Sequence, residues 1–400
     1  MSIYEEFGIE PIINASGAVT RLGGAPMPEE VLEAFCAAAR ESVPLDQLQG
    51  IASRIIADAT GAEAGIVTSG AAAALTLGTA AILARFDLRR IERLPQCDFP
   101  CEFVVAREQR NGYDHAVRAA GAKLIEVGFH EPVAGSGVRR CEAWEIEAAI
   151  GPETAGIFYV HDAEARPPLA EVVEVARRHN LPVLVDAAGE LPPRENLRTI
   201  LASGADLVAF SGGKAIRGPQ ASGILCGRRD FVGSAALQML DMDDHFALWE
   251  PPTNLIDKQS LKGMPRHGIG RALKVSKEQI VALLTALRLF ASGDYDRRRI
   301  DQRRYLESMI AELADLPIRH RLALPTDEQS SPKLELILDE AKLGRSALEV
   351  CCRLRRGSPP VYVGHALLDR GILVIDPLHL DEARTATLIR RLRAELAPER

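Results

Sequence analysis

The feature that most constrains the fold is the alternation of short apolar strands with helical segments through the middle of the chain. Runs rich in β-branched residues recur between residues 103 and 210, and segments with helical spacing of apolar residues separate them. The expected strands are Phe103–Ala106, Lys123–Val127, Ala155–Val160, Leu181–Val185 and Leu207–Phe210. The expected helices include 138–150, 169–179 and 195–203. Strands joined through helices pair in parallel, so we expect an α/β fold whose mostly parallel sheet is covered by helices.

The flanking segments differ from this central pattern. An irregular N-terminal arm precedes helices expected over 28–40 and 48–60. Periodicity is lost after Gly227, so residues 230–270 are expected to form a linker and an active-site loop. Helices over 275–290 and 297–313 then lead to a compact α+β segment. We therefore predict three parts: an arm and helix at 1–50, a large α/β domain at 51–275 and an α+β domain at 276–400.

Composition and charge exclude several classes of protein. The 400 residues carry a formal net charge of −7 with both signs interspersed, which argues against an extended nucleic-acid surface. No apolar run approaches the roughly 18 to 20 residues of a membrane helix. The N-terminus has no secretion signal, and the seven scattered cysteines indicate free thiols, so we expect a cytoplasmic protein. Cys97 and Cys101 lack a second ligand pair, so no metal site is expected.

One lysine stands at a sharp break in this pattern. The apolar run Leu207–Phe210 stops at Ser211, two glycines and Lys214, and a second apolar run follows Gly223. Glycines allow a bulky planar group to approach the backbone. A lysine held at the end of an apolar strand can lose charge by desolvation and become an amine nucleophile. Taken alone, the same segment is also compatible with a surface turn that carries a solvated lysine.

Other polar residues stand at comparable positions. Ser69, Gly70 and Ala71 form a small-residue turn that opens a buried helix over 71–84, and free N–H groups at such a turn can bind a phosphate. Asp186 follows the apolar run LPVLV, where a carboxylate either caps the next turn or meets a positive charge. His161 follows another expected strand, and Gln109 and Arg110 belong to a polar segment after the strand at 103–106.

The order of three of these groups fits one cofactor, pyridoxal 5'-phosphate (PLP). Its phosphate needs N–H and hydroxyl donors, as at Ser69. Its pyridine nitrogen needs a carboxylate to remain protonated, as at Asp186. Its aldehyde needs an amine for a Schiff base, as at Lys214. Three weak signals in one order reinforce each other, so we predict PLP as the cofactor.

The sequence also resembles a known family. The segment SGGKAIRGPQASGIL is similar to the lysine loop of fold-type I PLP enzymes, the aspartate aminotransferase superfamily. Further motifs resemble the selenocysteine synthase group and, within it, the D-glucosaminate-6-phosphate ammonia-lyases. These motifs are INASG at Ile13, TGAEAGIVTSGAAAAL at Thr60, VRAAGAKLIEVG at Val117, LPVLVDAAGELPP at Leu181, GADLVAFSGGKAIRGPQ at Gly204 and IGRALKVSKEQIVALL at Ile269. The resemblance runs from about residue 8 to residue 380.

This resemblance implies a large domain with a seven-stranded, mostly parallel sheet, a smaller C-terminal domain and at least a homodimer. It implies that Lys214 forms the Schiff base, that Asp186 holds the pyridine nitrogen and that His161 also lies in the cofactor site. The phosphate would be bound by Ser69, Gly70, Ala71 and Ser211. A residue of the segment Gln109-Arg110 would cover the ring, although this segment lacks the histidine or aromatic residue that is common in the family.

The implied reaction is an α,β-elimination. A β-hydroxy amino acid or amino sugar acid would lose its α-proton to Lys214 and then its hydroxyl, giving a 2-keto acid and ammonia. Selenocysteine synthases carry a tRNA-binding domain before the INASG-like arm, and this arm begins near residue 1, so we expect a small-molecule substrate and no nucleic acid. An anionic substrate would need cations, for which Arg21, His267 and Arg271 are candidates. A racemase, an aldolase, another transferase of the family and a non-catalytic binding protein are the alternatives.

Overall fold

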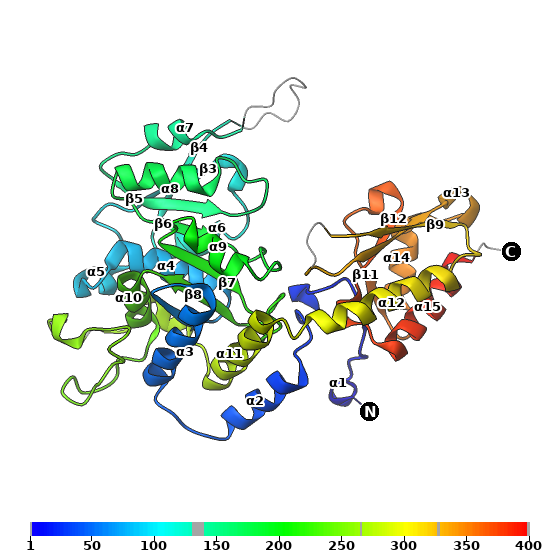
Figure 1. The fold of residues 1–400 in the computed structure, drawn as a ribbon, viewed down its shortest axis with the longest axis horizontal. Coiled ribbons are helices and arrows are strands. Elements are labelled where there is room, and N and C mark those ends of the chain that lie inside the picture. Colours follow the sequence, from blue (N-terminus) through cyan, green and yellow to red (C-terminus); the bar gives the residue numbers. More distant parts are fainter. Residues whose placement is uncertain (1, 130–139, 265, 326–328, 398–400) are drawn as a thin grey trace. The chain divides into compact units, whose positions relative to one another are not determined.

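The computed structural model describes residues 2–129, 140–264, 266–325 and 329–397. These residues form two compact units, one of residues 27–291 and one that joins residues 1–26 to residues 292–400 (Figure 1). The arm belongs to the second unit because its strand β1 (Ile13–Ala15) pairs in parallel with β11 (Val361–Val363). The three-part division at residues 50 and 275 stays a prediction about independently folding parts.

The first unit is built on a seven-stranded sheet. Its strands in spatial order are β2 (Ala64–Thr68), β8 (Gly223–Gly227), β7 (Leu207–Ser211), β6 (Val183–Asp186), β5 (Thr154–Val160), β3 (Glu102–Ala106) and β4 (Lys123–Val127). Only β8 runs antiparallel to its neighbours, and all the other pairs are parallel. The predicted α/β class with a mostly parallel sheet is confirmed.

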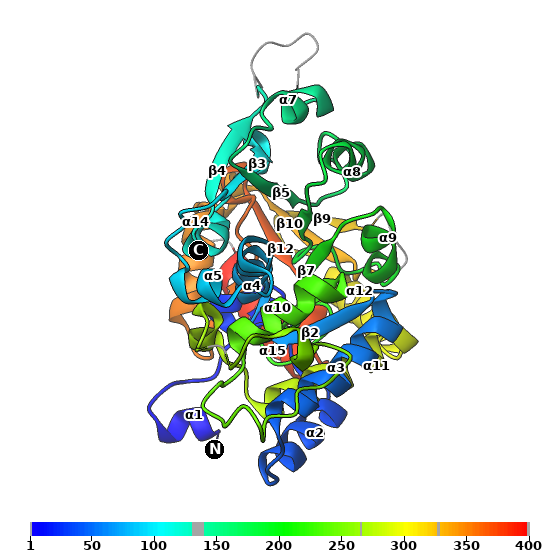
Figure 2. The ribbon, with the colours of Figure 1, turned by 90° about the vertical axis from the view of Figure 1, so that its left-hand side faces the viewer.

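Helices cover this sheet on both faces, with α8 and α9 on one side and α4 and α5 on the other (Figure 2). Helix α4 packs against β6, β7 and β8, and α10 packs against α4. None of the helices within the described residues is long and apolar enough to span a membrane. The helices of this unit are α2 (Glu29–Ala39), α3 (Leu45–Thr60), α4 (Ala71–Ala84), α5 (Leu88–Arg93), α6 (Asp114–Ala119), α7 (Ala143–Ala148), α8 (Leu169–Arg178), α9 (Asn196–Ala202), α10 (Arg229–Met239) and α11 (Lys277–Ser292), with 3-10 turns η2 (Arg107–Gln109), η3 (Lys258–Ser260) and η4 (Ile269–Leu273).

Two expectations about helices need correction or restriction. Residues 230–270 are not a linker throughout, because α10 occupies Arg229–Met239. Every residue from Phe231 to Met239 is buried, so the helix has no polar face and its sequence lacks the amphipathic period. The helix expected over 138–150 is α7, Ala143–Ala148, within the described residues, and the positions before Arg140 lie outside them.

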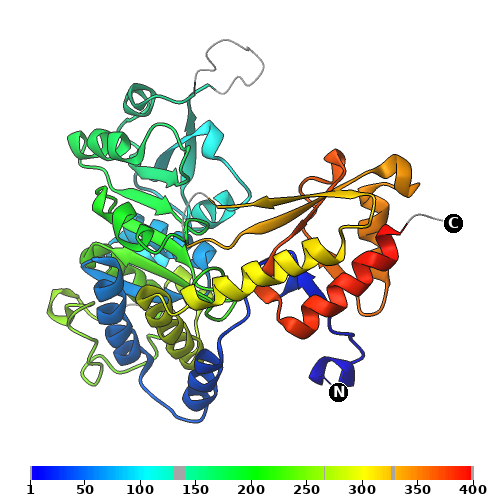
Figure 3. The ribbon, with the colours of Figure 1, turned by 45° about the vertical axis from the view of Figure 1, so that its right-hand side comes forward.

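The second unit is an α+β structure around its own core. Its antiparallel sheet has the order β12 (Ile372–Ile375), β10 (Lys333–Leu338), β9 (Ile318–Ala323), and α12 lies beside α15 (Figure 3). Leu306, Leu336, Leu354 and Leu388 are fully buried in this core. Strand β9 was not predicted because its sequence, IRHRLA, alternates charged and apolar residues at the sheet edge. The other elements are α1 (Ile3–Glu6), α12 (Asp296–Glu312), α13 (Glu340–Leu343), α14 (Ala347–Arg356), α15 (Glu382–Leu396), η1 (Thr20–Leu22), η5 (Leu368–Arg370) and η6 (Pro377–His379).

A close backbone contact joins strand β8 to the turn before α4. A Cβ atom at Gly223 would lie 2.5 Å from the carbonyl carbon of Gly70 and 2.7 Å from the amide nitrogen of Ala71. Backbone atoms cannot move aside as a flexible side chain can. Only glycine at position 223 therefore lets β8 lie against the start of α4 in this geometry.

We expect Gly223→Ala to lower the free energy of unfolding by about 1–3 kcal/mol, because the added methyl group must displace the turn at residues 70–71. Gly151→Ala is the matched control, since a Cβ there meets no atom within 4 Å and the backbone has no left-handed conformation. Urea unfolding of the two variants and the parent protein measures the difference. Equal stabilities of the two variants would contradict the close contact.

Candidate active site

The sheet brings several predicted residues to one edge. Because β5, β6 and β7 are parallel neighbours, their carboxyl ends lie together. Val160 pairs with Asp186, and Asp186 pairs with Ala209. The backbone N–H of His161 donates to the carbonyl of Asp186 over 2.9 Å. The residues that follow these strands are thus neighbours in space, as the alternating pattern predicted.

Asp186 is a buried carboxylate without an ion-pair partner among the described residues. It is 7% exposed, and its Oδ1 accepts a hydrogen bond from the N–H of Ala188 over 3.0 Å. Burial raises the pKa of the Asp186 carboxyl, while the Ala188 N–H and the charge of Lys214 lower it, and the charge of Glu190 raises it again. A buried carboxylate of this kind is stabilised by a cation that reaches it.

Lys214 lies in a tightly packed loop after β7. A Cβ at Gly213 would lie 2.6 Å from the Cα of Gln220, so the glycine before the lysine is needed for this packing. Lys214 is half-buried, and its Nζ has no hydrogen-bond or ion-pair partner in the part of the chain that the structure describes. Its charge acts on Asp186, yet no ion pair joins the two side chains, so more than 4.0 Å separates Nζ from the carboxylate oxygens.

The turn before α4 offers amides to an anion. The first helical hydrogen bond runs from the Ala74 N–H to the Gly70 carbonyl, so the three preceding N–H groups are not used by the helix. Gly70 has a φ of 102°, and Ser69 donates its hydroxyl to the carbonyl of Leu273 over 2.9 Å. Within the sheet, Gly223 of β8 pairs with Thr68 on one side and with Ser211 on the other. Ser69, Gly70, Ala71 and Ser211 therefore flank the same strand end.

Gln109 and Arg110 follow β3 on the same edge of the sheet. The Oε1 of Gln109 accepts the N–H of Val160 over 3.1 Å, and its Nε2 is buried with no partner among the described residues. The guanidinium of Arg110 is paired with the carboxylates of Asp114 and Glu126. These pairs raise the pKa of Arg110 chiefly through the hydrogen bond to Asp114. A contact of either residue with a cofactor stays a prediction.

Glu190 is a site residue that the sequence reasoning did not select. It lies four residues after Asp186, and its Oε2 is 3.7 Å from the Nδ1 of His161. Its N–H donates to the Ala187 carbonyl, and its own carbonyl accepts the side-chain amide of Asn196 over 2.8 Å. The signal available in the sequence was a second acid in the turn DAAGE, directly after the strand that ends at Asp186.

The three candidate substrate cations are engaged elsewhere. Arg271 pairs with Asp241 over 2.6 Å, and the Nε2 of His267 lies 3.3 Å from the same carboxylate. These partners lower the pKa of Asp241, after the larger effect of the Asp243 N–H. In the second unit, Arg21 lies over the ring of Tyr362, 5.8 Å from its centroid. The role of all three residues in substrate binding stays a prediction.

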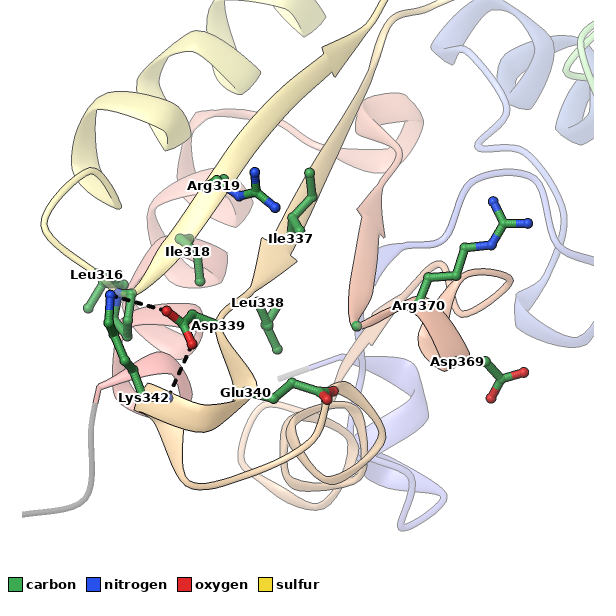
Figure 4. A pocket seen from close by; sticks show the side chains of 12 residues that line it. Leu316, Ile318, Arg319, Ile337, Leu338, Asp339, Glu340, Lys342, Asp369 and Arg370 are labelled. Atoms are coloured by element: carbon green, nitrogen blue, oxygen red, sulfur yellow. Dashed lines mark hydrogen bonds and ion pairs between the residues drawn. The ribbon is translucent and has the colours of Figure 1, made fainter.

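The second unit contains a separate open hollow of about 760 Å³ (Figure 4). Arg319, Lys342 and Arg370 line it together with three acids, Asp339, Glu340 and Asp369. Asp339 and Lys342 pair with each other over 3.2 Å. Cations and acids are thus equal in number, and none of the predicted site residues contributes to this hollow.

The donor set at the sheet edge of the first unit fits PLP chemically. A phosphate requires several N–H donors, which residues 71–73 at the start of α4 supply. A protonated ring nitrogen requires a carboxylate, and Asp186 is buried without an ion pair among the described residues. An aldehyde requires an amine without competing partners, which is the state of Lys214 within the described residues.

Comparisons with known proteins agree with this fit. The family model described as "SelA: L-seryl-tRNA selenium transferase" matches residues 113–242. A 5'-C-glycyluridine monooxygenase-decarboxylase from a Streptomyces species is 31% identical over 396 residues, which cover 97% of this chain and 90% of the relative. The D-glucosaminate-6-phosphate ammonia lyase of Salmonella typhimurium is 28% identical over 405 aligned positions, covering 98% of this chain and 97% of the relative.

A solved structure titled D-glucosaminate-6-phosphate ammonia-lyase superposes with a TM-score of 0.81 at 27% identity, over 99% of this chain and 98% of that one. Similarity thus extends along nearly the whole length of each relative and includes both units. PLP is the cofactor of this group, as the lysine, carboxylate and phosphate turn predicted. The chain therefore belongs to the selenocysteine synthase-like family of fold-type I PLP-dependent enzymes.

Proposed function

We propose that the protein is a PLP-dependent lyase that acts on a β-hydroxy amino acid or amino sugar acid of the D-glucosaminate 6-phosphate type. It removes the α-proton and the β-hydroxyl and releases a 2-keto acid and ammonia. The observation that carries this proposal is the likeness to an ammonia lyase over 98% of the chain, with a TM-score of 0.81 to a solved ammonia-lyase structure.

Each group at the sheet edge has a task in this proposal. Lys214 would hold the cofactor covalently through its amine and, with the substrate bound, would take the α-proton of the substrate. Asp186 keeps the ring nitrogen protonated. The amides at residues 71–73 and the hydroxyl of Ser211 hold the phosphate, and the hydroxyl of Ser69 joins them by leaving the carbonyl of Leu273. When bound, the cofactor accommodates the electron pair that remains after the α-proton has left.

A second candidate function has an observation of its own. The relative with 31% identity is named as a monooxygenase-decarboxylase that acts on 5'-C-glycyluridine. The same base and carboxylate would serve that reaction, which releases carbon dioxide and consumes oxygen. A racemase, an aldolase or a transferase would also use Lys214 as a base. The products therefore discriminate between these functions better than the cofactor site does.

We also propose a homodimer of this chain in the cytoplasm. The family resemblance supports the dimer, and seven scattered cysteines that form no disulfide among the described residues support a reducing compartment. We do not propose a tRNA substrate like that of the selenium transferases, because the two relatives that match over nearly their full length are named for small-molecule substrates.

The first prediction from the proposed function concerns Lys214. Lys214→Ala should abolish borohydride-dependent attachment of PLP to the protein and lower turnover by at least about a thousandfold, because the covalent amine and the base are lost together. Lys123→Ala is the control, since its Nζ pairs with Glu102 at the exposed sheet edge. Peptide mass spectrometry after reduction locates the adduct. An adduct retained in Lys214→Ala would reject the assignment.

The second prediction concerns Asp186 in the cofactor-free protein. Its folded-state pKa is raised, so the ionised carboxyl destabilises the folded state at neutral pH, and this cost disappears as the pH falls below the folded pKa. Asp186→Asn should therefore raise the melting temperature at neutral pH, with a gain that shrinks towards acidic pH. The same variant should bind PLP more weakly.

The control for this prediction is Asp114→Asn, which changes another buried carboxylate. Asp114 is 3% exposed but pairs with Arg110. Its replacement should cost about 1–3 kcal/mol of unfolding free energy because a charged hydrogen bond is lost. Calorimetry of both variants across pH tests whether Asp186→Asn stabilises the protein while Asp114→Asn destabilises it. If Asp186→Asn lowered the melting temperature at neutral pH, the carboxylate of Asp186 would not carry the electrostatic cost that we infer.

The third prediction concerns the products. With D-glucosaminate 6-phosphate, the PLP-loaded enzyme should release ammonia and a 2-keto acid in equal amounts without consuming oxygen. Oxygen uptake with release of carbon dioxide from a glycyl nucleoside would instead favour the second candidate. An unchanged amino acid that has exchanged its α-hydrogen would indicate a racemase.

A further inference from the structure

His161 and Glu190 form an ionisable pair beside Asp186. The Nδ1 of His161 lies 3.7 Å from the Oε2 of Glu190, and each side chain is 22% exposed. The backbone N–H of His161 donates a hydrogen bond to the carbonyl of Asp186. The backbone N–H and the carbonyl of Glu190 also make hydrogen bonds. The pair is thus anchored to the strand end that carries the predicted cofactor carboxylate.

The imidazole has a defined orientation. Nδ1 is buried and makes no hydrogen bond within the described residues, whereas a fifth of the side chain is exposed. Nε2 also makes no hydrogen bond within the described residues, yet it is not one of the buried atoms, so this nitrogen reaches the surface. A ring with one nitrogen facing a carboxylate and the other facing outward is the arrangement of a histidine that transfers protons.

The location suits a proton transfer to the substrate. His161 follows β5 and Lys214 follows β7, with β6 between them. Neighbouring strands are about 4.8 Å apart, so the strand ends that carry the two residues are about 10 Å apart. A substrate held between them can present its α-carbon to Lys214 and its β-substituent to His161.

We propose that His161 is the general acid of the elimination and that Glu190 is the positioning residue that holds its imidazole. This inference rests on the proposed lyase function. The Nε2 proton passes to the β-oxygen as the carbon–oxygen bond breaks, and water leaves with the bonding electron pair. The electrons left on the α-carbon by the proton that Lys214 removed form the new carbon–carbon double bond. Solvent then returns a proton to His161, and the Glu190 carboxylate stabilises the positive charge of the protonated ring.

The leaving group provides a specific test. Hydroxide leaves a carbon poorly and needs a proton, while chloride leaves without one. His161→Gln should reduce elimination from D-glucosaminate 6-phosphate by about 100-fold or more but leave elimination from its 3-chloro-3-deoxy analogue within about threefold of the parent rate. Equal losses with both substrates would overturn the role of His161 as an acid.

Two further readouts separate this role from a structural one. In deuterium oxide, the His161→Gln enzyme should still exchange the α-hydrogen of the substrate at the parent rate, because removal of that proton belongs to Lys214. The dissociation constant of PLP, measured on the cofactor-free protein by fluorescence, should change much less than elimination does, because His161 lies in the cofactor site but is not among the residues that would hold the phosphate, the ring nitrogen or the aldehyde. Loss of exchange or of cofactor affinity would mean that His161 holds the site together instead, and would overturn the proposal.

Glu190→Gln should show the same selective loss on the hydroxyl substrate, about tenfold in size, because the ring remains but its carboxylate is gone. His179→Gln is the matched control, since His179 at the end of α8 and Glu147 of α7 form another histidine–glutamate pair, 3.1 Å apart, and each of these side chains is 36% exposed. A parent enzyme that releases no ammonia would reject the lyase function. A parent enzyme that releases ammonia, with a fully active His161→Gln variant, would reject this inference alone.

Discussion

The buried carboxylate of Asp186 is the constraint on which the site depends. A carboxylate that is 7% exposed, with one backbone hydrogen bond to its side chain and no ion pair among the described residues, is costly in the folded chain. The three parallel strands at the centre of the sheet hold the group in place, so the fold maintains an electrostatic cost at the position where the protonated ring nitrogen of PLP would reduce it. The carboxylate of Asp186 therefore lowers the stability of the cofactor-free protein and would raise its affinity for PLP.

The antiparallel strand β8 is the second element of this arrangement. It lies between β2 and β7, so the turn that begins α4 and the strand that leads to Lys214 flank one strand although they are far apart in the chain. The approach is close enough to require glycine at position 223. The turn that would hold the phosphate is thereby brought near the loop whose lysine would hold the aldehyde. The topology sets the distance between this turn and this loop.

The sequence predicted the parts of this arrangement that depend on local patterns. Strand–helix alternation gave the parallel strands and, with them, the edge that gathers His161, Asp186 and Lys214. Two kinds of element were missed for physical reasons. Helix α10 is buried on all sides and has no amphipathic period, and β9 is an edge strand with alternating charges. Glu190 was missed because its importance comes from its distance to His161, a residue on another strand, and no local pattern encodes that distance.

Two relatives that match this chain over nearly its whole length are named for different reactions, an ammonia lyase in one case and a monooxygenase-decarboxylase in the other. In this chain, Lys214 and Asp186 would serve the cofactor whichever of these reactions takes place, so these two residues do not decide between the reactions. The deciding groups must contact the part of the substrate that differs, beyond the α-carbon. In this chain the strand ends beside Asp186 carry the His161–Glu190 pair after β5 and β6 and the buried amide of Gln109 after β3, and these are the groups that we propose for such a contact. A proton donor at this position favours loss of a hydroxyl group, because an oxygen leaves readily only as it gains a proton.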